Sequence, residues 1–205
     1  MLTLYYAPGS SALAAHIVLE EIDATYDSVL ITTTDGGVTA PDYLRINPKG
    51  RVPALETPTG VVTESPAILT YLAETFPQAS LMPSDIGDRA RAHEINAYLC
   101  ATVHVAFAHA KRGTRWAHSP EAVADLRAKA PHVLAQTVTL VEERYIEGPF
   151  VFGAQYSICD PYVFLAHRWL VQLGVDLAAF PRLVAHRDVM LARPATQRAL
   201  AIHGL

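Results

Sequence analysis

A short proline-bounded segment, PQASLMP from Pro77 to Pro83, separates two parts of the chain with different patterns. Before it, strand-like and helix-like runs alternate, and after it no run reads as a strand. The 205 residues suit one large domain or two small ones, and the change of pattern favours two. We therefore predict a first α/β domain over 1–77, a linker over 78–83 and an all-α second domain over 84–205.

The first part predicts the element order βαβ, then a loop, then ββα. A strand–helix–strand crossover normally pairs its two strands in parallel, and a hairpin adds antiparallel strands. The expected result is a small mixed sheet with helices on its faces. The predicted strands are 2–6, 26–31, 52–56 and 61–63, the helices are 12–21, 41–46 and 65–76, and the polar run TTTDGGVTAP, 32–41, is the loop.

The second part carries apolar residues at helical spacing. Pro131 lies inside one helical region and predicts a kink or a break there. Ser157 and Asp160 have the form of a capping box with Asp in place of Glu, which we interpret as structural. The expected helical regions are 85–110, 121–145, 160–173, 180–191 and 194–202.

Composition excludes several classes of protein. Sixteen Lys and Arg against 20 Asp and Glu leave a net charge of −4, so the charge gives no reason to expect a nucleic acid or an anionic membrane as partner. Two cysteines, Cys100 and Cys159, rule out a disulfide framework and a four-cysteine zinc site. His104 and His109 are five apart and diverge on a helix, so we expect no metal site. The first residues lack a secretory pattern, and we expect a cytoplasmic protein.

Three local features carry chemical information. The first is the segment from Tyr6 to Ser11, where a strand ends, the chain turns at Pro8-Gly9, and Ser10 and Ser11 precede a helix. Free N–H groups and the helix dipole favour an anion at such a terminus. Simple capping of the helix by serine explains the same residues.

The other two features lie around the predicted hairpin. Pro53 interrupts a strand-like run, so Val52–Pro53 is either at a sheet edge or a cis peptide bond that exposes the Val52 backbone to a ligand. Glu64 and Ser65 precede the next helix. A carboxylate, a hydroxyl and free N–H groups could hold both charges of an amino-acid headgroup, and capping is the alternative.

Four separated segments together resemble a known family: YYAPGSSALAAHIVLEE, INPKGRVPALET, TESPAILTYLAETFP and YSICDPYVF. In this order and spacing they are similar to cytosolic glutathione S-transferases, and most to the bacterial beta class. The resemblance spans nearly the whole chain. It implies a thioredoxin-like N-terminal domain, an all-α C-terminal domain, and a homodimer that uses glutathione as co-substrate.

The resemblance also implies roles for individual residues. Val52 matches the residue before the family's cis-proline, here Pro53, whose backbone pairs with the cysteinyl part of glutathione. Glu64 and Ser65 match the pair that holds the γ-glutamyl group. His104 matches a histidine that this class places near the thiol.

At one position the sequence departs from the beta class: Ser11 stands where that class usually carries a cysteine. The resemblance therefore implies a hydroxyl as the group that stabilises the glutathione thiolate. Ser11, the preceding Ser10 and Tyr6 are the three candidate donors, and the sequence does not choose among them.

The leading hypothesis is a detoxifying transferase in which glutathione thiolate attacks a small hydrophobic electrophile bound against the helical domain. Ala97 and Val105 stand where the class often has an asparagine and a lysine, which motivates a second hypothesis, a non-catalytic ligand-binding or interaction protein. A glutathione-dependent isomerase or dehalogenase is a third.

Overall fold

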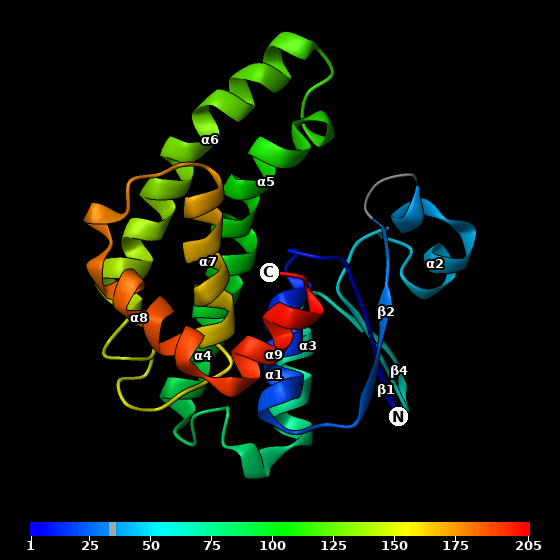
Figure 1. The fold of residues 1–205 in the computed structure, drawn as a ribbon, viewed down its shortest axis with the longest axis vertical. Coiled ribbons are helices and arrows are strands. Elements are labelled where there is room, and N and C mark those ends of the chain that lie inside the picture. Colours follow the sequence, from blue (N-terminus) through cyan, green and yellow to red (C-terminus); the bar gives the residue numbers. More distant parts are fainter. Residues whose placement is uncertain (33–35) are drawn as a thin grey trace. The chain divides into compact units, whose positions relative to one another are not determined.

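The computed structural model describes residues 1–32 and 36–205 and divides into two compact units (Figure 1). The first unit joins Met1–Pro83 to the C-terminal segment Leu191–Leu205, and the second is Ser84–Met190. The predicted loop over 32–41 includes positions 33–35, which lie outside the described residues. From Gly37 to Thr39 the same stretch forms a 3₁₀ turn, η1.

The first unit contains the predicted mixed sheet. Its four strands lie in the order β2-β1-β3-β4. β1 pairs with β2 in parallel and with β3 antiparallel, and β3 pairs with β4 antiparallel, as the crossover and the hairpin predict. Together with the helical second unit this confirms the predicted fold class. The strands are β1 (Leu2–Tyr6), β2 (Tyr26–Leu30), β3 (Ala54–Thr57) and β4 (Gly60–Thr63).

Helix α1 is the centre of the first unit's core. All its residues from Ala12 to Leu19 are buried, so it is covered on every side. Each fully buried aliphatic side chain, such as Leu13 or Ile17, contributes about 1.5–3 kcal/mol relative to exposure. The other helices of this unit are α2 (Pro41–Ile46), α3 (Ser65–Thr75), the turn η2 (Pro77–Ala79) and α9 (Pro194–Ile202).

The C-terminal helix α9 packs on α1, and here the structure differs from the predicted second domain over 84–205. Helix α1 ends in Glu20 and Glu21, which a helix C-terminus disfavours. Arg193 offsets one of these charges with two hydrogen bonds to Glu21, 2.6 and 2.8 Å long, and Arg198 pairs with Glu20. These ion pairs and the buried small residues of α9 place the end of the chain in the first unit.

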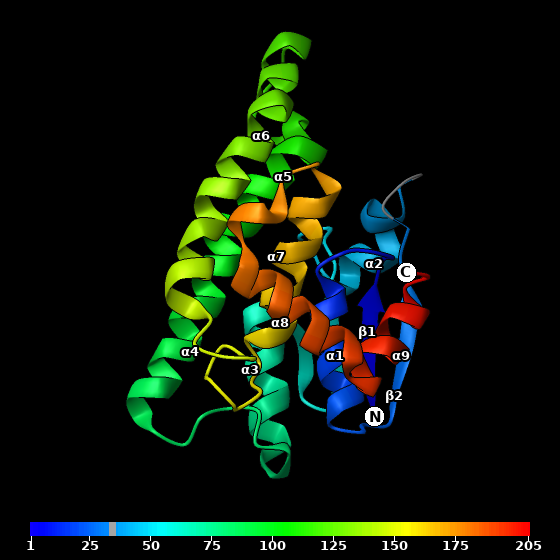
Figure 2. The same cartoon turned by 60° about the vertical axis from the view of Figure 1, so that its left-hand side comes forward.

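The regular elements described in the second unit are all helices, and the connection between η5 and α7 adds two isolated β-bridges, Phe150 with Gly153 and Phe152 with Gln155. Helices α5 and α6 lie side by side, as Figure 2 shows. Helix α6 continues through Pro131, so the predicted break is not found there. Because proline has no N–H, the helix lacks one backbone hydrogen bond at this position. No described helix is both long and apolar enough to span a bilayer. The helices are α4 (Ile86–Tyr98), the π-helical turn η3 (Leu99–Val103), α5 (His104–Arg112), η4 (Gly113–Arg115), α6 (Pro120–Leu140), the π-helical turn η5 (Val141–Tyr145), α7 (Asp160–Gln172), η6 (Leu177–Ala179) and α8 (Pro181–Ala192), the last of which crosses the unit boundary.

The Asp160 carboxylate at the start of α7 is fully buried, and groups from three segments of the chain hydrogen-bond to it. It accepts from the backbone N–H and the hydroxyl of Ser157 at 2.7 and 3.1 Å, and from the Val151 N–H at 2.8 Å. His186 Nε2 lies 3.0 Å away. The Ser157 hydroxyl accepts in turn from the Cys159 N–H, which completes a box of the predicted kind with the donor one residue earlier than usual.

We expect Asp160→Ala to lower the free energy of unfolding of the second unit by about 3 kcal/mol or more, because it leaves several buried donors without an acceptor. Urea unfolding followed by circular dichroism measures this loss. Asp125→Ala, at an exposed site on α6, is the matched control and stays within about 0.5 kcal/mol of wild type. A small effect at Asp160 would contradict the structural interpretation of the box.

Candidate active site

The sheet register brings three of the predicted site segments to one edge. Tyr5, near the end of β1, lies opposite Ala54, the first residue of β3, and Ala54 lies opposite Thr63, the last residue of β4. The loop after β1, the Val52–Pro53 segment before β3 and the Glu64–Ser65 segment after β4 therefore leave the sheet at the same end. The structure thus groups the predicted residues of the first unit.

Ser10 lies in the turn between β1 and α1, and its hydroxyl is engaged. It donates to the carbonyl of Ala7 at 2.7 Å and accepts from the backbone N–H of Ala12 at 3.3 Å. The hydroxyl proton is therefore used to hold the turn. For Ser10, the capping interpretation of the sequence holds.

Ser11 differs from its neighbour. It already has helical backbone angles, φ −63° and ψ −11°, just before the first residue of α1, and its side chain makes no capping hydrogen bond within the described part of the chain. The residue is only 5% exposed. Among the described residues, the Ser11 hydroxyl therefore has no capping partner, and it lies at the start of a ten-residue helix whose first N–H groups have no intrahelical acceptors.

A chain of hydrogen bonds ties this turn to the C-terminus. The backbone N–H of Gly9 donates to His203 Nδ1 at 3.1 Å. His203 Nε2 lies 2.7 Å from His16 Nδ1, and His16 Nε2 lies 2.9 Å from the hydroxyl oxygen of Ser28 on β2. Both imidazoles are buried, so the turn before Ser11 is held from inside the unit.

The Gly9 N–H fixes the direction of the chain, because an amide can only donate. His203 Nδ1 must accept, so the His203 proton is on Nε2 and is donated to His16 Nδ1. His16 then carries its own proton on Nε2 and donates it to Ser28. Burial, and next the nearby His203, lower the pKa of His16 from 6.5 to about 3, so His16 is neutral at neutral pH.

The segment before β3 is held by two side chains. The Tyr43 hydroxyl and the Asn47 amide both donate to the carbonyl of Arg51, each at 2.6 Å. The Val52–Pro53 bond is cis, as the family resemblance implies. Since β3 begins at Ala54, Val52 lies outside the paired strand.

Glu64 has backbone angles that few residues other than glycine adopt, φ 73° and ψ 125°. Such a conformation costs about 1–3 kcal/mol and concentrates at functional sites. Its carboxylate is half exposed and pairs with Lys49 Nζ at 2.6 Å, while Ser65 is buried at the start of α3. A carboxylate therefore stands beside a helix N-terminus, the arrangement expected for an amino-acid headgroup.

His104 is the one predicted catalytic residue that lies in the second unit. It is the first residue of α5 and follows the π-helical turn η3, a feature common at functional sites. Its ring stacks on Trp169 with a centroid distance of 4.6 Å, and its Nδ1 lies 3.3 Å from the Tyr162 hydroxyl. Trp169 and Tyr162 are fully buried, so the core positions this imidazole. His109 instead contacts Trp116, and the two histidines diverge as predicted.

Comparisons with known proteins agree with this architecture. Residues 1–74 match the family described as "Glutathione S-transferase, N-terminal domain". Glutathione S-transferase GST-4.5 of Xanthomonas campestris pv. campestris is 32% identical over 98% of this chain and 98% of its own. The chain belongs to the glutathione S-transferase family.

Two further relatives are informative about this family member. A crystal structure of a glutathione transferase homolog from Sulfitobacter with bound glutathione superposes with a TM-score of 0.96 at 39% identity, covering 100% of this chain and 99% of that one. Maleylacetoacetate isomerase of Pseudomonas aeruginosa is 30% identical over 96% of this chain and 93% of its own. The fold with a thioredoxin-like first unit is thus shared over the full length.

Sequence reasoning missed three residues of this transferase-family site. His16 and His203 lie 187 positions apart, and no local pattern links them. Lys49 is in the segment INPKGRVPALET, but its pairing with Glu64 follows from the fold.

Tyr6 is placed differently from the other two candidate donors, Ser10 and Ser11. Its hydroxyl lies 3.5 Å from the Ile202 carbonyl, and its ring packs on His16 and His203.

The lowered pKa of His16 predicts an acid-sensitive first unit. The unfolded chain takes up a proton below its ordinary pKa of about 6.5 while folded His16 stays neutral, so stability is lost as pH falls toward about 3. From about pH 7.5 to about pH 5 the loss assigned to this residue is about 2 kcal/mol. Urea unfolding at both pH values should show wild type losing more stability than His16→Gln by about that amount.

The exposed His118→Gln variant is the control for this experiment and should follow the wild-type pH dependence. Equal losses in wild type and His16→Gln would contradict a buried neutral His16.

Proposed function

We propose that this protein is a glutathione transferase that joins glutathione to small hydrophobic electrophiles, with Ser11 stabilising the thiolate. The observation that carries the assignment is the difference between the two serines. The Ser10 hydroxyl is held by Ala7 and Ala12, whereas the Ser11 hydroxyl has no capping bond within the described residues. Tyr6 is directed to the Ile202 carbonyl, which leaves Ser11 as the favoured donor.

The energetics suit a serine. A free thiol has a pKa of about 8.5, and lowering it by about two units requires about 2.7 kcal/mol of preferential stabilisation of the thiolate. One hydrogen bond to a charged acceptor contributes about 1.5–3 kcal/mol. The N-terminus of α1 adds about 0.3–1 kcal/mol. One hydroxyl at this helix end is therefore sufficient.

Glutathione binding is assigned to the edge of the sheet described above. Glu64 would bind the α-ammonium of the γ-glutamyl group, in place of its present partner Lys49. The hydroxyl and backbone N–H of Ser65 would bind the α-carboxylate at the start of α3. The backbone of Val52, outside the paired strand, would pair with the cysteinyl residue, with Pro53 shaping the turn.

The remaining assignments follow the family. His104 in the second unit would assist by hydrogen bonding or proton transfer, and its ring is held by Trp169 and Tyr162. We expect a cytoplasmic homodimer. Thiol exchange through Cys159 is disfavoured, since burial raises the pKa of its thiol far above the usual range.

A second candidate is glutathione-dependent cis–trans isomerisation, favoured by the similarity to the Pseudomonas aeruginosa maleylacetoacetate isomerase. The thiolate would add to the double bond, the resulting single bond would rotate, and expulsion of the thiolate would restore glutathione. Turnover of maleylacetoacetate with no net consumption of glutathione identifies this activity. Conjugation consumes glutathione, so the two activities are distinguishable in one assay.

We expect the thiol of glutathione bound to wild type to ionise well below its free pKa, as shown by ultraviolet difference titration. Ser11→Ala should raise that pKa by about one to two units, because it removes the donor to the thiolate. Ser10→Ala is the matched control and should leave the bound thiol ionised. Loss of the thiolate in Ser10→Ala alone would reassign the role to Ser10, and glutathione binding without a thiolate would favour the non-catalytic alternative.

We expect Glu64→Gln to weaken glutathione binding roughly tenfold or more in calorimetric titration, because it removes a charge-assisted hydrogen bond to the ammonium group. Glu56→Gln, on β3 and bonded to Tyr5, is the control and should leave the affinity unchanged. Unchanged affinity in Glu64→Gln would refute the assigned headgroup site.

A further inference from the structure

The last turn of helix α9 contacts the loop between β1 and α1 at two points. Where the loop begins, the Tyr6 hydroxyl lies 3.5 Å from the carbonyl oxygen of Ile202. In the middle of the loop, the backbone N–H of Gly9 donates to Nδ1 of His203 at 3.1 Å. Two consecutive residues of α9 and its cap therefore hold the segment that leads to Ser11.

The sequence after α9 explains how His203 comes to face the loop. Gly204 has φ 66°, a left-handed conformation, and its N–H donates to the carbonyl of Ala201 at 3.1 Å. The N–H of Leu205 donates to the carbonyl of Leu200 at 3.0 Å. These two hydrogen bonds form a Schellman motif, in which the residue before the glycine caps the helix. His203 is that residue, and it is only 3% exposed.

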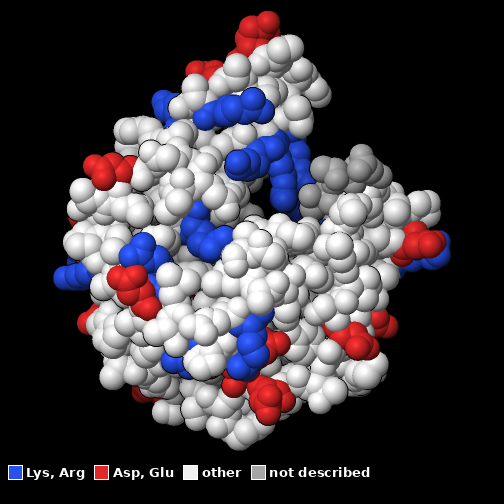
Figure 3. Space-filling view, in the orientation of Figure 1, with Lys and Arg blue, Asp and Glu red and all other residues white. Residues whose placement is uncertain are grey.

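Helix α9 is itself fixed on α1 by ion pairs. Arg193, just before α9, donates to the Glu21 carboxylate at 2.6 and 2.8 Å, and Arg198 pairs with Glu20. Figure 3 shows basic and acidic side chains next to each other over α1 and α9. Since α1 begins directly after Ser11, one helix receives the loop at its start and α9 at its end.

The loop contains a β-turn with two possible orientations of its central peptide. The N–H of Ser10 donates to the carbonyl of Ala7 at 3.1 Å, and Pro8 and Gly9 lie between them, with Gly9 at φ 67°. Proline followed by a glycine with positive φ is typical of a type II turn. In a type I turn the peptide between these two residues is rotated by roughly 180°, and its N–H points to the opposite side.

His203 distinguishes the two orientations of this peptide. Its Nδ1 accepts from Gly9 because its proton is on Nε2, which lies 2.7 Å from His16 Nδ1. Rotation of the peptide would turn the Pro8 carbonyl oxygen toward His203 in place of the Gly9 N–H. Two acceptors would then face each other, so the contact stabilises the observed turn and disfavours the rotated one.

We propose that His203 is a positioning residue for the glutathione thiolate. By holding the peptide between Pro8 and Gly9, it sets the direction of the Ser11 hydroxyl. This inference rests on the proposed function, in which Ser11 is the donor to the thiolate. Ser11 lies two residues after Gly9 and is only 5% exposed, so a rotated turn would move its hydroxyl relative to the bound sulfur. His203 acts through Gly9 and needs no contact with glutathione.

Two substitutions separate the two hydrogen bonds of His203. His203→Asn places an oxygen near the position of Nδ1 and keeps an acceptor for Gly9, whereas His203→Gln reaches the position of Nε2 and keeps a partner for His16. The readout is the pKa of the thiol of bound glutathione, from ultraviolet difference titration. We expect His203→Gln to raise this pKa by about one unit and His203→Asn to stay within about 0.3 units of wild type.

Glutathione affinity at two pH values shows whether the effect acts through the thiolate. At about pH 8.5 the thiolate contributes to binding, so a thiol pKa raised by about one unit weakens the affinity of His203→Gln up to about tenfold. At about pH 5.5 the bound thiol is largely protonated, and the affinity should match wild type. A distorted binding site would instead lose affinity at both pH values.

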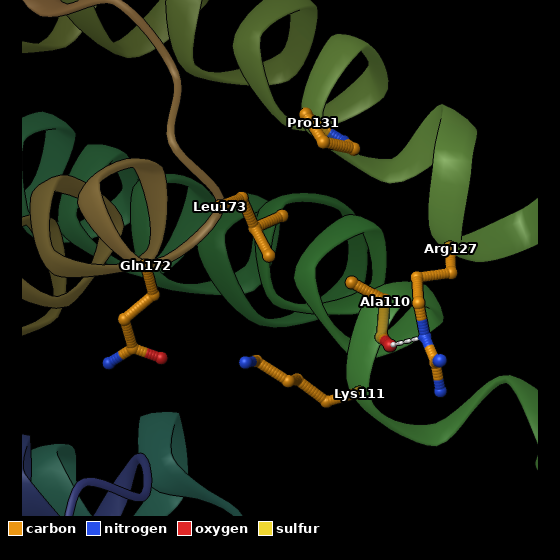
Figure 4. Close-up of a pocket in the computed structure, with 6 residues that line it drawn as sticks. All are labelled: Ala110, Lys111, Arg127, Pro131, Gln172 and Leu173. Carbon is orange, nitrogen blue, oxygen red and sulfur yellow. Dashed lines mark hydrogen bonds between the residues drawn. The ribbon is translucent and has the colours of Figure 1, made fainter.

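The matched control is Gln172→Asn, which shortens an amide side chain in a pocket of the second unit (Figure 4). Gln172 contributes none of the loop contacts described above, so this variant should have the thiol pKa and both affinities of wild type. Urea unfolding checks that each variant is folded under the conditions of the titration.

A second variant weakens the same contact without changing His203. Gly204→Val places a branched side chain at φ 66°, which L residues disfavour, and so disturbs the helix end that presents His203. The position is exposed, so we expect the protein to fold. The pKa of the bound thiol should rise as in His203→Gln, by about half a unit.

Three results would overturn the positioning role. These are an unchanged thiol pKa in His203→Gln and Gly204→Val, equal pKa shifts in His203→Gln and His203→Asn, and equal losses of affinity at the two pH values. If His203→Gln does not fold, an unchanged thiol pKa in Gly204→Val is sufficient to overturn it. Glutathione bound to wild type without a thiolate would overturn the proposed function as well, whereas a thiolate unaffected by these variants would overturn this role alone.

Discussion

The pairing of β1 on both of its edges is the constraint on which the candidate site depends. Tyr5 is opposite Val29 of β2 on one side and Ala54 of β3 on the other. A shift of β1 by one residue against its neighbours would turn the fully buried Leu4 toward the opposite face and displace the loop after β1 by about 3.3 Å. The core therefore fixes the register, and the register fixes which loops meet at the edge of the sheet.

The loop that carries the two serines is also held by the hydrogen bonds that link Gly9, His203, His16 and Ser28. Two neutral imidazoles inside a core are tolerated only when their ring nitrogens have partners, and His16 satisfies both of its nitrogens with His203 and Ser28. Gly9, with φ 67°, adopts the left-handed turn that points its N–H at His203. The geometry around Ser11 is thus supported by contacts with the far end of the chain rather than by Ser11 itself.

Local sequence signals predicted the elements of the first unit well because turn-forming and helix-capping residues mark where those elements begin and end. Helix α1 has the predicted bounds, Ala12–Glu21, since Pro8-Gly9 and two serines mark its start. Proline was a weaker guide inside a helix, because neighbouring packing can offset one lost hydrogen bond at Pro131. The predicted second domain extended to residue 205, whereas Leu191–Leu205 belongs to the first compact unit. A helical pattern alone does not identify the packing partner of α9, which only the fold shows.

The residues of the candidate site were likewise predictable only where a local sequence pattern marks them. Glu64 and Ser65 were found because a carboxylate and a hydroxyl before a helix are visible in the sequence. The distinction between Ser10 and Ser11 was not visible, because adjacent hydroxyls look alike until backbone angles assign one of them to the turn. The pairing of Lys49 with Glu64 and the histidine chain depend on residues that only tertiary structure brings together.

The return of Leu191–Leu205 to the first unit has a consequence for the order of biosynthesis. A ribosome releases α1 well before α9, yet α9 covers α1 in the folded unit. The first unit to emerge is therefore the last to be completed, and Ser84–Met190 can fold while α1 still exposes the side that α9 will cover.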